Sequence, residues 1–151
     1  MQAGYHSELF LPDEDATTQF GARIAPCLIP GDCILLDGPI GSGKTHLARA
    51  IIQTRIGTSE DVPSPTYTLV QVYEYDEGEI WHGDLYRLTN TFEISELGLE
   101  QAFETAITLV EWPDRLPDPP LSALHITFKQ KDDGRLLQLA SDSDHWSKLN
   151  V

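Results

Sequence analysis

The sequence predicts an α/β protein: a mixed β-sheet flanked by helices, with a C-terminal β-hairpin. Three observations support this class. Short continuous apolar runs, such as residues 33–36, are typical of strands covered on both faces. Segments with apolar residues three or four positions apart alternate with these runs, as expected for helices that pack on a sheet. Residues 124–128 alternate between apolar and polar side chains and lead to an Asp133-Gly134 turn, which indicates a hairpin.

The first half of the chain predicts two helices around one buried strand. Residues 9–11 are apolar and end a short strand, and apolar side chains then recur every four residues from Ala16 until Pro26 stops the helix. The buried strand at 33–36 follows a proline-glycine turn. Residues 45–56 then place their apolar side chains on one connected face, with a glycine directly after them as the stop.

The second half predicts strands around one broken helix. A proline-rich segment at 63–65 excludes a helix, and residues 69–75 are rich in β-branched and aromatic side chains. The helical pattern of residues 93–105 is interrupted at Gly98. We expect the remaining strands at 80–82, 107–110, 124–128 and 135–140, and a short terminal helix within 141–151 that includes His145, Trp146 and Leu149.

Length and composition predict one cytoplasmic domain over residues 1–151. The hydrophobic fraction is 40%, which fits a globular protein rather than a disordered acidic tail. No apolar run approaches the roughly 18 residues that a membrane helix needs, so we expect no membrane partner. Cys27 and Cys33 have no further cysteine or histidine placed to complete a zinc site, so ordinary reduced thiols are expected.

The charge is strongly acidic and unevenly distributed. Ten basic and 24 acidic residues give a net charge of −14, and residues 61–120, with 13 acids and 2 bases, carry −11 of it. Such a surface repels a phosphate backbone, so we expect no autonomous tight binding of RNA or DNA. The acidic region is interpreted equally well as a solvated face or as a docking surface for a basic protein.

One motif carries a specific chemistry. Residues 38–45 read Gly-Pro-Ile-Gly-Ser-Gly-Lys-Thr, which matches G-x-x-x-x-G-K-[ST] between the predicted strand and the predicted helix. The glycines Gly38, Gly41 and Gly43 let the backbone curl so that amides point at phosphate oxygens, and the helix N-terminus adds partial positive charge. Lys44 is expected to bind the β- and γ-phosphates and Thr45 to bind Mg²⁺. The fold is therefore predicted to resemble that of P-loop NTPases, and adenine is preferred because no guanine signature appears.

Two acids follow predicted strands and complete this chemistry. Asp84 follows residues 80–83, and Glu111 follows residues 107–110. Acids at the carboxyl ends of neighbouring strands lie on the ligand side of such a sheet. Asp84 is therefore the predicted metal ligand, and Glu111 the predicted group that orients water for hydrolysis.

The loop before the strand at 69–75 adds a candidate switch. Thr66 or Thr68 could close on the γ-phosphate, although a hydroxyl that caps the local backbone explains them equally well. His82, Tyr86 and Trp112 stay ambiguous, because strand aromatics usually belong to the core.

Taken in order, these motifs resemble the TsaE family of bacterial ATPases of tRNA threonylcarbamoyladenosine biosynthesis. The resemblance rests on the P-loop together with S-P-T-Y-T-L at 64–69, H-G-D-L-Y-R-L at 82–88 and V-E-W-P at 110–113. It implies slow ATP hydrolysis with Mg²⁺ while docked on the TsaB and TsaD type heterodimer that transfers threonylcarbamoyl to adenosine 37 of tRNAs reading codons that begin with A. The tRNA would be contacted indirectly.

The resemblance also implies roles for single residues. It assigns Lys44 and Thr45 to phosphates and Mg²⁺, Asp84 to the metal, Glu111 to hydrolysis and Thr66 to the switch loop. It places Thr17 near the adenine and Trp112 beside the nucleotide or the partner. The P-loop residues expected to bind nucleotide also include Ser42 and His46, where the family commonly has Ala and Thr, and Pro39 stands where an acid is frequent.

Two other functions remain open from the sequence. A P-loop small-molecule kinase would need an arginine-bearing lid, and after Arg87 the chain has only Arg115 and Arg135. A scaffold that binds nucleotide without needing to hydrolyse it would keep the P-loop and make no use of Glu111.

Overall fold

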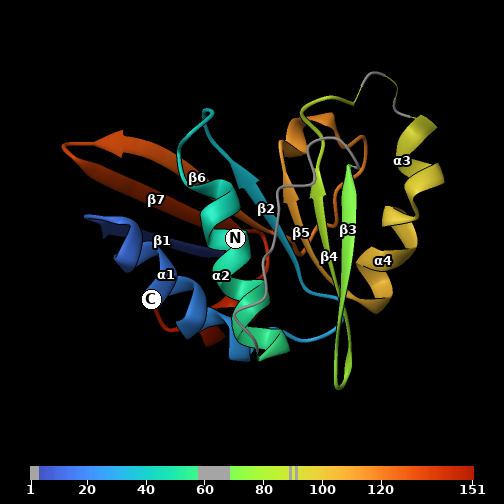
Figure 1. Cartoon of the computed structure of the whole chain (residues 1–151), viewed down its shortest axis with the longest axis horizontal. Coiled ribbons are helices and arrows are strands. Elements are labelled where there is room, and N and C mark those ends of the chain that lie inside the picture. Colours follow the sequence, from blue (N-terminus) through green and yellow to red (C-terminus); the bar gives the residue numbers. More distant parts are fainter. Residues whose placement is uncertain (1–3, 58–68, 89, 91) are drawn as a thin grey trace.

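A seven-stranded mixed sheet forms the centre of the computed structural model, which describes residues 4–57, 69–88, 90 and 92–151 (Figure 1). Its strands follow the order β1-β7-β6-β2-β5-β4-β3. They are β1 (Tyr5–Leu11), β2 (Cys33–Asp37), β3 (Val70–Tyr75), β4 (Gly78–Asp84), β5 (Ile107–Glu111), β6 (Leu124–Lys131) and β7 (Gly134–Ser141). The predicted fold class is confirmed, and each predicted strand is present.

The central strand β2 is buried because both of its neighbours are parallel to it and both of its faces are covered. It pairs with β5 on one side and with β6 on the other. Ile34 and Leu36 belong to one apolar cluster, whereas Cys33 and Leu35 belong to the cluster on the opposite face. A strand buried on both faces needs a continuous apolar run, which is the pattern that the sequence shows at 33–36.

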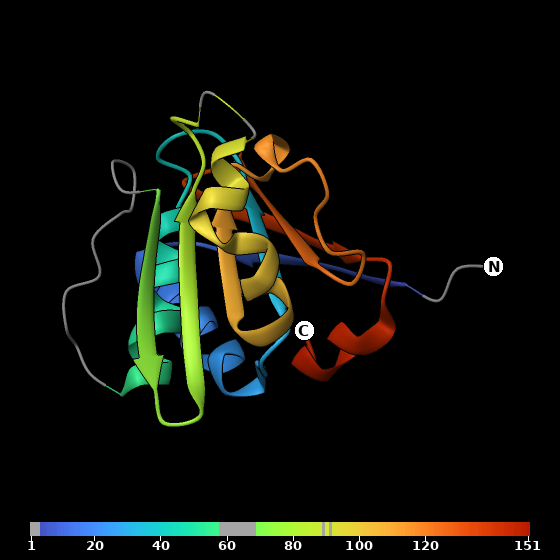
Figure 2. The ribbon, with the colours of Figure 1, turned by 90° about the vertical axis from the view of Figure 1, so that its right-hand side faces the viewer.

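Helices cover the two faces of the sheet. α1 (Glu14–Ile24) and α2 (Lys44–Ile56) lie side by side on one face, whereas α3 (Phe92–Leu97) and α4 (Leu99–Thr105) lie on the other and face the viewer in Figure 2. Asp13 caps α1, its carboxylate accepting a hydrogen bond of 2.8 Å from the Ala16 amide. Gly57 ends α2 and Gly98 separates α3 from α4, both in the left-handed conformation, as the sequence predicts.

The C-terminal tail is anchored to the turn before β2. It forms a 3-10 helix, η3 (Asp144–Leu149), in which the Trp146 side chain is only 1% exposed. The carboxylate of Asp32 accepts hydrogen bonds from Lys148 at 2.7 Å and from His145 at 2.8 Å. The predicted terminal helix is therefore present as a 3-10 helix, and an ion pair across the chain holds it in place.

The two cysteines have a structural role. Both are free thiols, and burial raises the pKa of Cys33 to about 12, so its thiol stays protonated at neutral pH. That both thiols are reduced stays a prediction. Within the described part of the chain, no helix has the length and apolar character to cross a membrane.

A close contact between α1 and α2 gives the first testable prediction. A Cβ at Gly21 would lie 2.6 Å from the Ala50 Cβ, so Gly21→Ala should lower the free energy of unfolding by about 1–3 kcal/mol through overpacking. Ala50→Gly should cost about 1 kcal/mol in helix propensity, while the double variant should recover part of the Gly21→Ala loss because it restores the space. Urea unfolding of all four proteins measures the coupling, and simple additivity would contradict the proposed contact.

Candidate functional site

The loop between β2 and α2 adopts backbone dihedral angles that favour glycine. Gly38, Gly41 and Gly43 have φ values of 152°, 80° and 107°, a region that residues with side chains rarely adopt. A Cβ at Gly38 would also lie 2.9 Å from the Phe128 Cβ of β6. The loop is therefore curled tightly over the sheet and leads directly into the N-terminus of α2.

Lys44, the first residue of α2, folds back over this loop. Its ammonium donates a hydrogen bond to the Gly38 carbonyl and lies 3.5 Å from the centre of the Trp112 ring. Burial lowers the pKa of Lys44, and the nearby carboxylates, led by Glu111 and Asp37, act in the opposite direction. The ammonium is thus a partly desolvated cation beside the loop, where an anionic ligand would stabilise its charged form.

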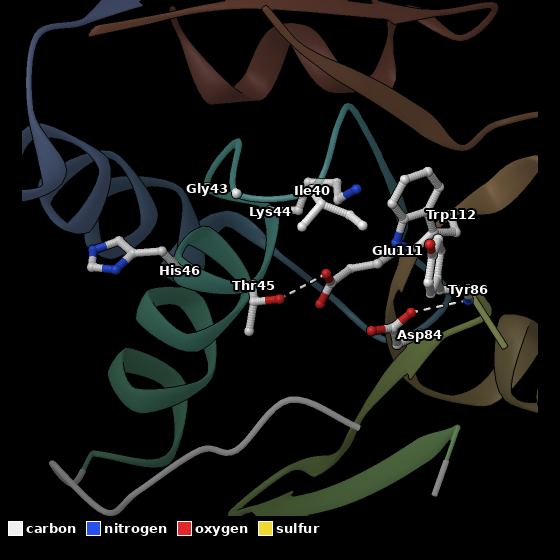
Figure 3. Close-up of a pocket in the computed structure, with 10 residues that line it drawn as sticks. Ile40, Gly43, Lys44, Thr45, His46, Asp84, Tyr86, Glu111 and Trp112 are labelled. Atoms are coloured by element: carbon white, nitrogen blue, oxygen red, sulfur yellow. Dashed lines mark hydrogen bonds between the residues drawn. The ribbon is translucent and has the colours of Figure 1, made fainter. Parts of the chain in front are cut away.

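The two predicted acids lie side by side beneath the loop. Asp84 ends β4, Glu111 ends β5, and the two are register partners in the parallel ladder. The Thr45 hydroxyl donates to Glu111 Oε1 at 2.8 Å, as Figure 3 shows. The structure therefore brings Thr45, Asp84 and Glu111 to one edge of the sheet, with Thr45 bonded to Glu111.

Glu111 is held on its other side by a residue that sequence reasoning left ambiguous. His82 Nε2 lies 2.7 Å from Glu111 Oε2, and both side chains are almost fully buried. An ionised Glu111 carboxylate would accept this hydrogen bond from the Nε2–H group. The two oxygens of Glu111 are thus fixed by different donors, Thr45 on α2 and His82 on β4. The histidine of H-G-D at 82–84 was the available sequence signal for this contact.

A cleft of about 430 Å³ opens above these groups. Its lining residues are Ile40, Gly41, Gly43, Lys44, Thr45, His46, Asp84, Tyr86, Glu111 and Trp112. The rings of Tyr86 and Trp112 form one wall, with centroids 4.8 Å apart. The Asp84 carboxylate accepts a hydrogen bond of 3.0 Å from the Tyr86 amide, which fixes its position in the cleft. The volume and the convergent polar groups are typical of a small-molecule site.

A second cavity, of about 330 Å³, lies on the other side of the loop. It is lined by Thr17 of α1, by Gly41 and Gly43 of the loop and by Arg135 of β7. His46 lines both cavities, and its Nε2 lies 2.7 Å from the Thr18 hydroxyl of α1. In Figure 3 its ring points away from Asp84 and Glu111. Thr17 and His46 are therefore next to the P-loop, in a cavity that Asp84 and Glu111 do not line.

The switch-loop threonine and the metal ligands are the remaining predicted parts of the site. Thr66 and the rest of the S-P-T-Y-T segment lie outside the described residues. Among those that are described, no cluster of three or more acids, histidines or cysteines could hold a metal by itself. A site built on Thr45 and one or two carboxylates fits Mg²⁺, which usually keeps waters and phosphate oxygens as its remaining ligands.

Ser42 gives a prediction about stability. Its buried hydroxyl has no hydrogen-bond partner among the described residues, so Ser42→Ala should leave the free energy of unfolding unchanged or raise it by about 1 kcal/mol. Ser141 is the matched control, because its buried hydroxyl accepts from the Ser143 amide at 3.1 Å and its loss should cost about 1 kcal/mol. Denaturant unfolding compares the two, and a clear loss in Ser42→Ala would show that its hydroxyl is satisfied.

Comparison with known proteins matches the chain to a family. The family model of threonylcarbamoyl adenosine biosynthesis protein TsaE matches residues 11–137. The TsaE protein of Rickettsia bellii is 37% identical over 87% of this chain and 92% of its own length, and that of Synechocystis is 43% identical over 75% and 74%. The crystal structure of YdiB from Bacillus subtilis shares the fold, with a TM-score of 0.77 and 23% identity over 99% of this chain and 95% of that one. The chain therefore belongs to the TsaE family, whose members act in tRNA threonylcarbamoyladenosine biosynthesis.

Proposed function

We propose that the protein binds ATP with Mg²⁺, hydrolyses it slowly, and thereby resets the heterodimer that transfers threonylcarbamoyl to adenosine 37 of tRNA. The observation that carries this proposal is the hydrogen bond of 2.8 Å between Thr45 and Glu111. It places a strand-end carboxylate beside the hydroxyl that would hold Mg²⁺, and P-loop NTPases use acids near the metal. Family membership supports the pathway.

The residues present fit a nucleoside triphosphate. The positive φ values of Gly38, Gly41 and Gly43 fit a loop that turns amides toward phosphate oxygens, and the α2 N-terminus favours an anion. Lys44, now bonded to the Gly38 carbonyl and stacked on Trp112, is within the same cleft and would bind the β- and γ-phosphates. Ser42 belongs to the same loop.

The chemistry of hydrolysis is assigned to two acids. Bound Mg²⁺ would neutralise charge on the phosphates, with Thr45 and Asp84 holding it. Glu111 would orient the attacking water, because its carboxylate lies beside Thr45 and is fixed by His82. Thr66 lies outside the described residues. It remains the proposed residue of the switch loop that closes on the γ-phosphate.

The nucleoside is proposed to extend toward α1. The second cavity lies on the side of the loop opposite the paired acids. It is lined by Thr17 and His46 and has room for a nucleotide base. Trp112, partly exposed beside Lys44, would lie next to the bound nucleotide or the docked partner.

The partner is proposed to be the TsaB and TsaD type heterodimer in the cytoplasm. The net charge of −14 supports indirect rather than direct contact with tRNA. Of the two arginines after Arg87, Arg115 donates to the Leu88 carbonyl and Arg135 to the Ser42 and Gly41 carbonyls, so neither is arranged as the lid of a kinase.

Calorimetry with MgATP and MgADP tests nucleotide binding and hydrolysis. Lys44→Ala should weaken ATP binding by about ten-fold or more, because it removes a charge-assisted contact. Glu111→Gln should bind ATP within a few-fold of wild type but release phosphate about 10²-fold more slowly. Arg23→Ala, at the far end of α1 from the second cavity, is the control for charge. A folded wild-type protein that takes up no nucleotide would overturn the proposal, and unchanged phosphate release in Glu111→Gln would assign hydrolysis elsewhere.

Reconstitution tests the role in the complex. The heterodimer should retain this protein more strongly with ATP than with ADP, because hydrolysis is proposed to release it. Repeated tRNA modification should require the wild-type chain and fail with Lys44→Ala. Many turnovers without the chain would exclude a resetting role, and equal activity of wild type and Glu111→Gln, with ATP bound in both, would favour a scaffold.

A further inference from the structure

The P-loop is held from outside by an arginine of the C-terminal hairpin. Arg135, the second residue of β7, donates from Nε to the Ser42 carbonyl and from Nη2 to the Gly41 carbonyl, both at 3.0 Å. Its Nη1 donates to Gln130 Oε1 at 3.0 Å and to the Gly134 carbonyl at 3.1 Å. The planar guanidinium therefore bridges two successive P-loop peptides to the hairpin from which it projects.

These contacts fix the direction of the amides in the same peptides. A trans peptide is planar, and its N–H points away from its C=O. The peptide from Ser42 to Gly43 directs its oxygen at Arg135, so the Gly43 amide points away from Arg135. The preceding peptide directs its oxygen at Arg135 too, while its Ser42 amide donates to the Pro39 carbonyl at 3.1 Å.

A glycine-rich loop needs such restraints. Gly41 and Gly43 both have positive φ and, having no Cβ, could rotate their peptides at little steric cost. A rotated peptide would present a carbonyl oxygen where a phosphate needs a donor. Two hydrogen bonds from one rigid fork oppose this rotation at both peptides.

The hairpin that carries Arg135 packs closely against neighbouring segments. A Cβ at Gly134 would lie 2.4 Å from the Leu11 carbonyl oxygen, so the turn is pressed against the end of β1. On the same hairpin, the ring of Phe128 lies beneath the loop, 3.6 Å from where a Gly43 Cβ would stand.

We propose that Arg135 is the positioning residue of the P-loop: its fork-shaped contact with two loop carbonyls preorganises the loop amides for a nucleoside polyphosphate. This rests on the proposed function and extends the nucleotide site to a hairpin beyond the four motif blocks at 38–113. Arg135 acts through the loop carbonyls, and because its side chain also lines the second cavity, the loop spectra of the nucleotide-free protein separate this role from a direct contact with the nucleoside. Its loss should weaken ATP and ADP binding alike, because both carry the phosphates that the loop amides would bind.

Three variants of the full chain separate this role from general charge and from folding. Arg135→Met removes every donor and keeps the apolar stem. Arg135→Lys keeps the cation but cannot hold two carbonyls with a rigid fork. Lys129→Met is the control, because it removes one exposed cation of the same hairpin on the strand face opposite Phe128.

Two measurements are made on each variant. Calorimetry with MgADP and MgATP should show a loss of about ten-fold or more for Arg135→Met, a smaller loss for Arg135→Lys and less than two-fold for Lys129→Met. Amide NMR of the nucleotide-free protein should show the Gly41 to Lys44 signals shifted or broadened in Arg135→Met, with signals elsewhere in the sheet unchanged.

The outcomes are distinct. An Arg135→Met variant that binds within two-fold of wild type, or no more weakly than Lys129→Met, overturns the role of the arginine, and so does an unperturbed loop spectrum. If Arg135→Met does not fold, Arg135→Lys decides: wild-type affinity together with a wild-type loop spectrum overturns the proposal. A wild-type protein that binds no nucleotide defeats the proposed function, while the loop spectra still decide whether Arg135 orders the loop.

Discussion

The parallel pairing of β2, β5 and β4 is the constraint on which the rest of the site depends. It sets the ends of three strands at one edge of the sheet, so the P-loop after β2 lies above Glu111 and Asp84. Parallel strands need crossover connections, and α2, on the face that also carries α1, is part of the connection that leads from β2 toward β4. If the register of β5 slipped by one residue, Glu111 would face the other side of the sheet and lose both Thr45 and His82.

Burial gives this edge its electrostatic character. Lys44, Asp84 and Glu111 are each at most 5% exposed, so their charges act on one another with little screening by solvent. Each is held by hydrogen bonds within the protein, which lowers the cost of keeping charged groups away from water. A site with one desolvated ammonium and paired carboxylates is suited to a ligand that brings both phosphate and a divalent cation.

The loop is supported from several directions. Phe128 lies beneath it, Trp112 closes over Lys44, and the guanidinium of Arg135 holds its outer carbonyls. Trp112 itself has a φ of 59°, a conformation that costs free energy in a residue with a large side chain and that recurs at functional sites. The surroundings, rather than the glycines alone, therefore determine the shape of the loop.

The sequence by itself determined the elements and the motif, because both depend on short-range physics. The period of apolar residues marks α2, a continuous apolar run marks β2, and the glycines at 38, 41 and 43 are required by local backbone angles. Only the tertiary structure decided which side chains meet. Residues 82 and 111 are 29 positions apart, and residues 42 and 135 are 93 apart. Such contacts follow from strand order and register, which depend on how all the elements pack together and not on any local pattern.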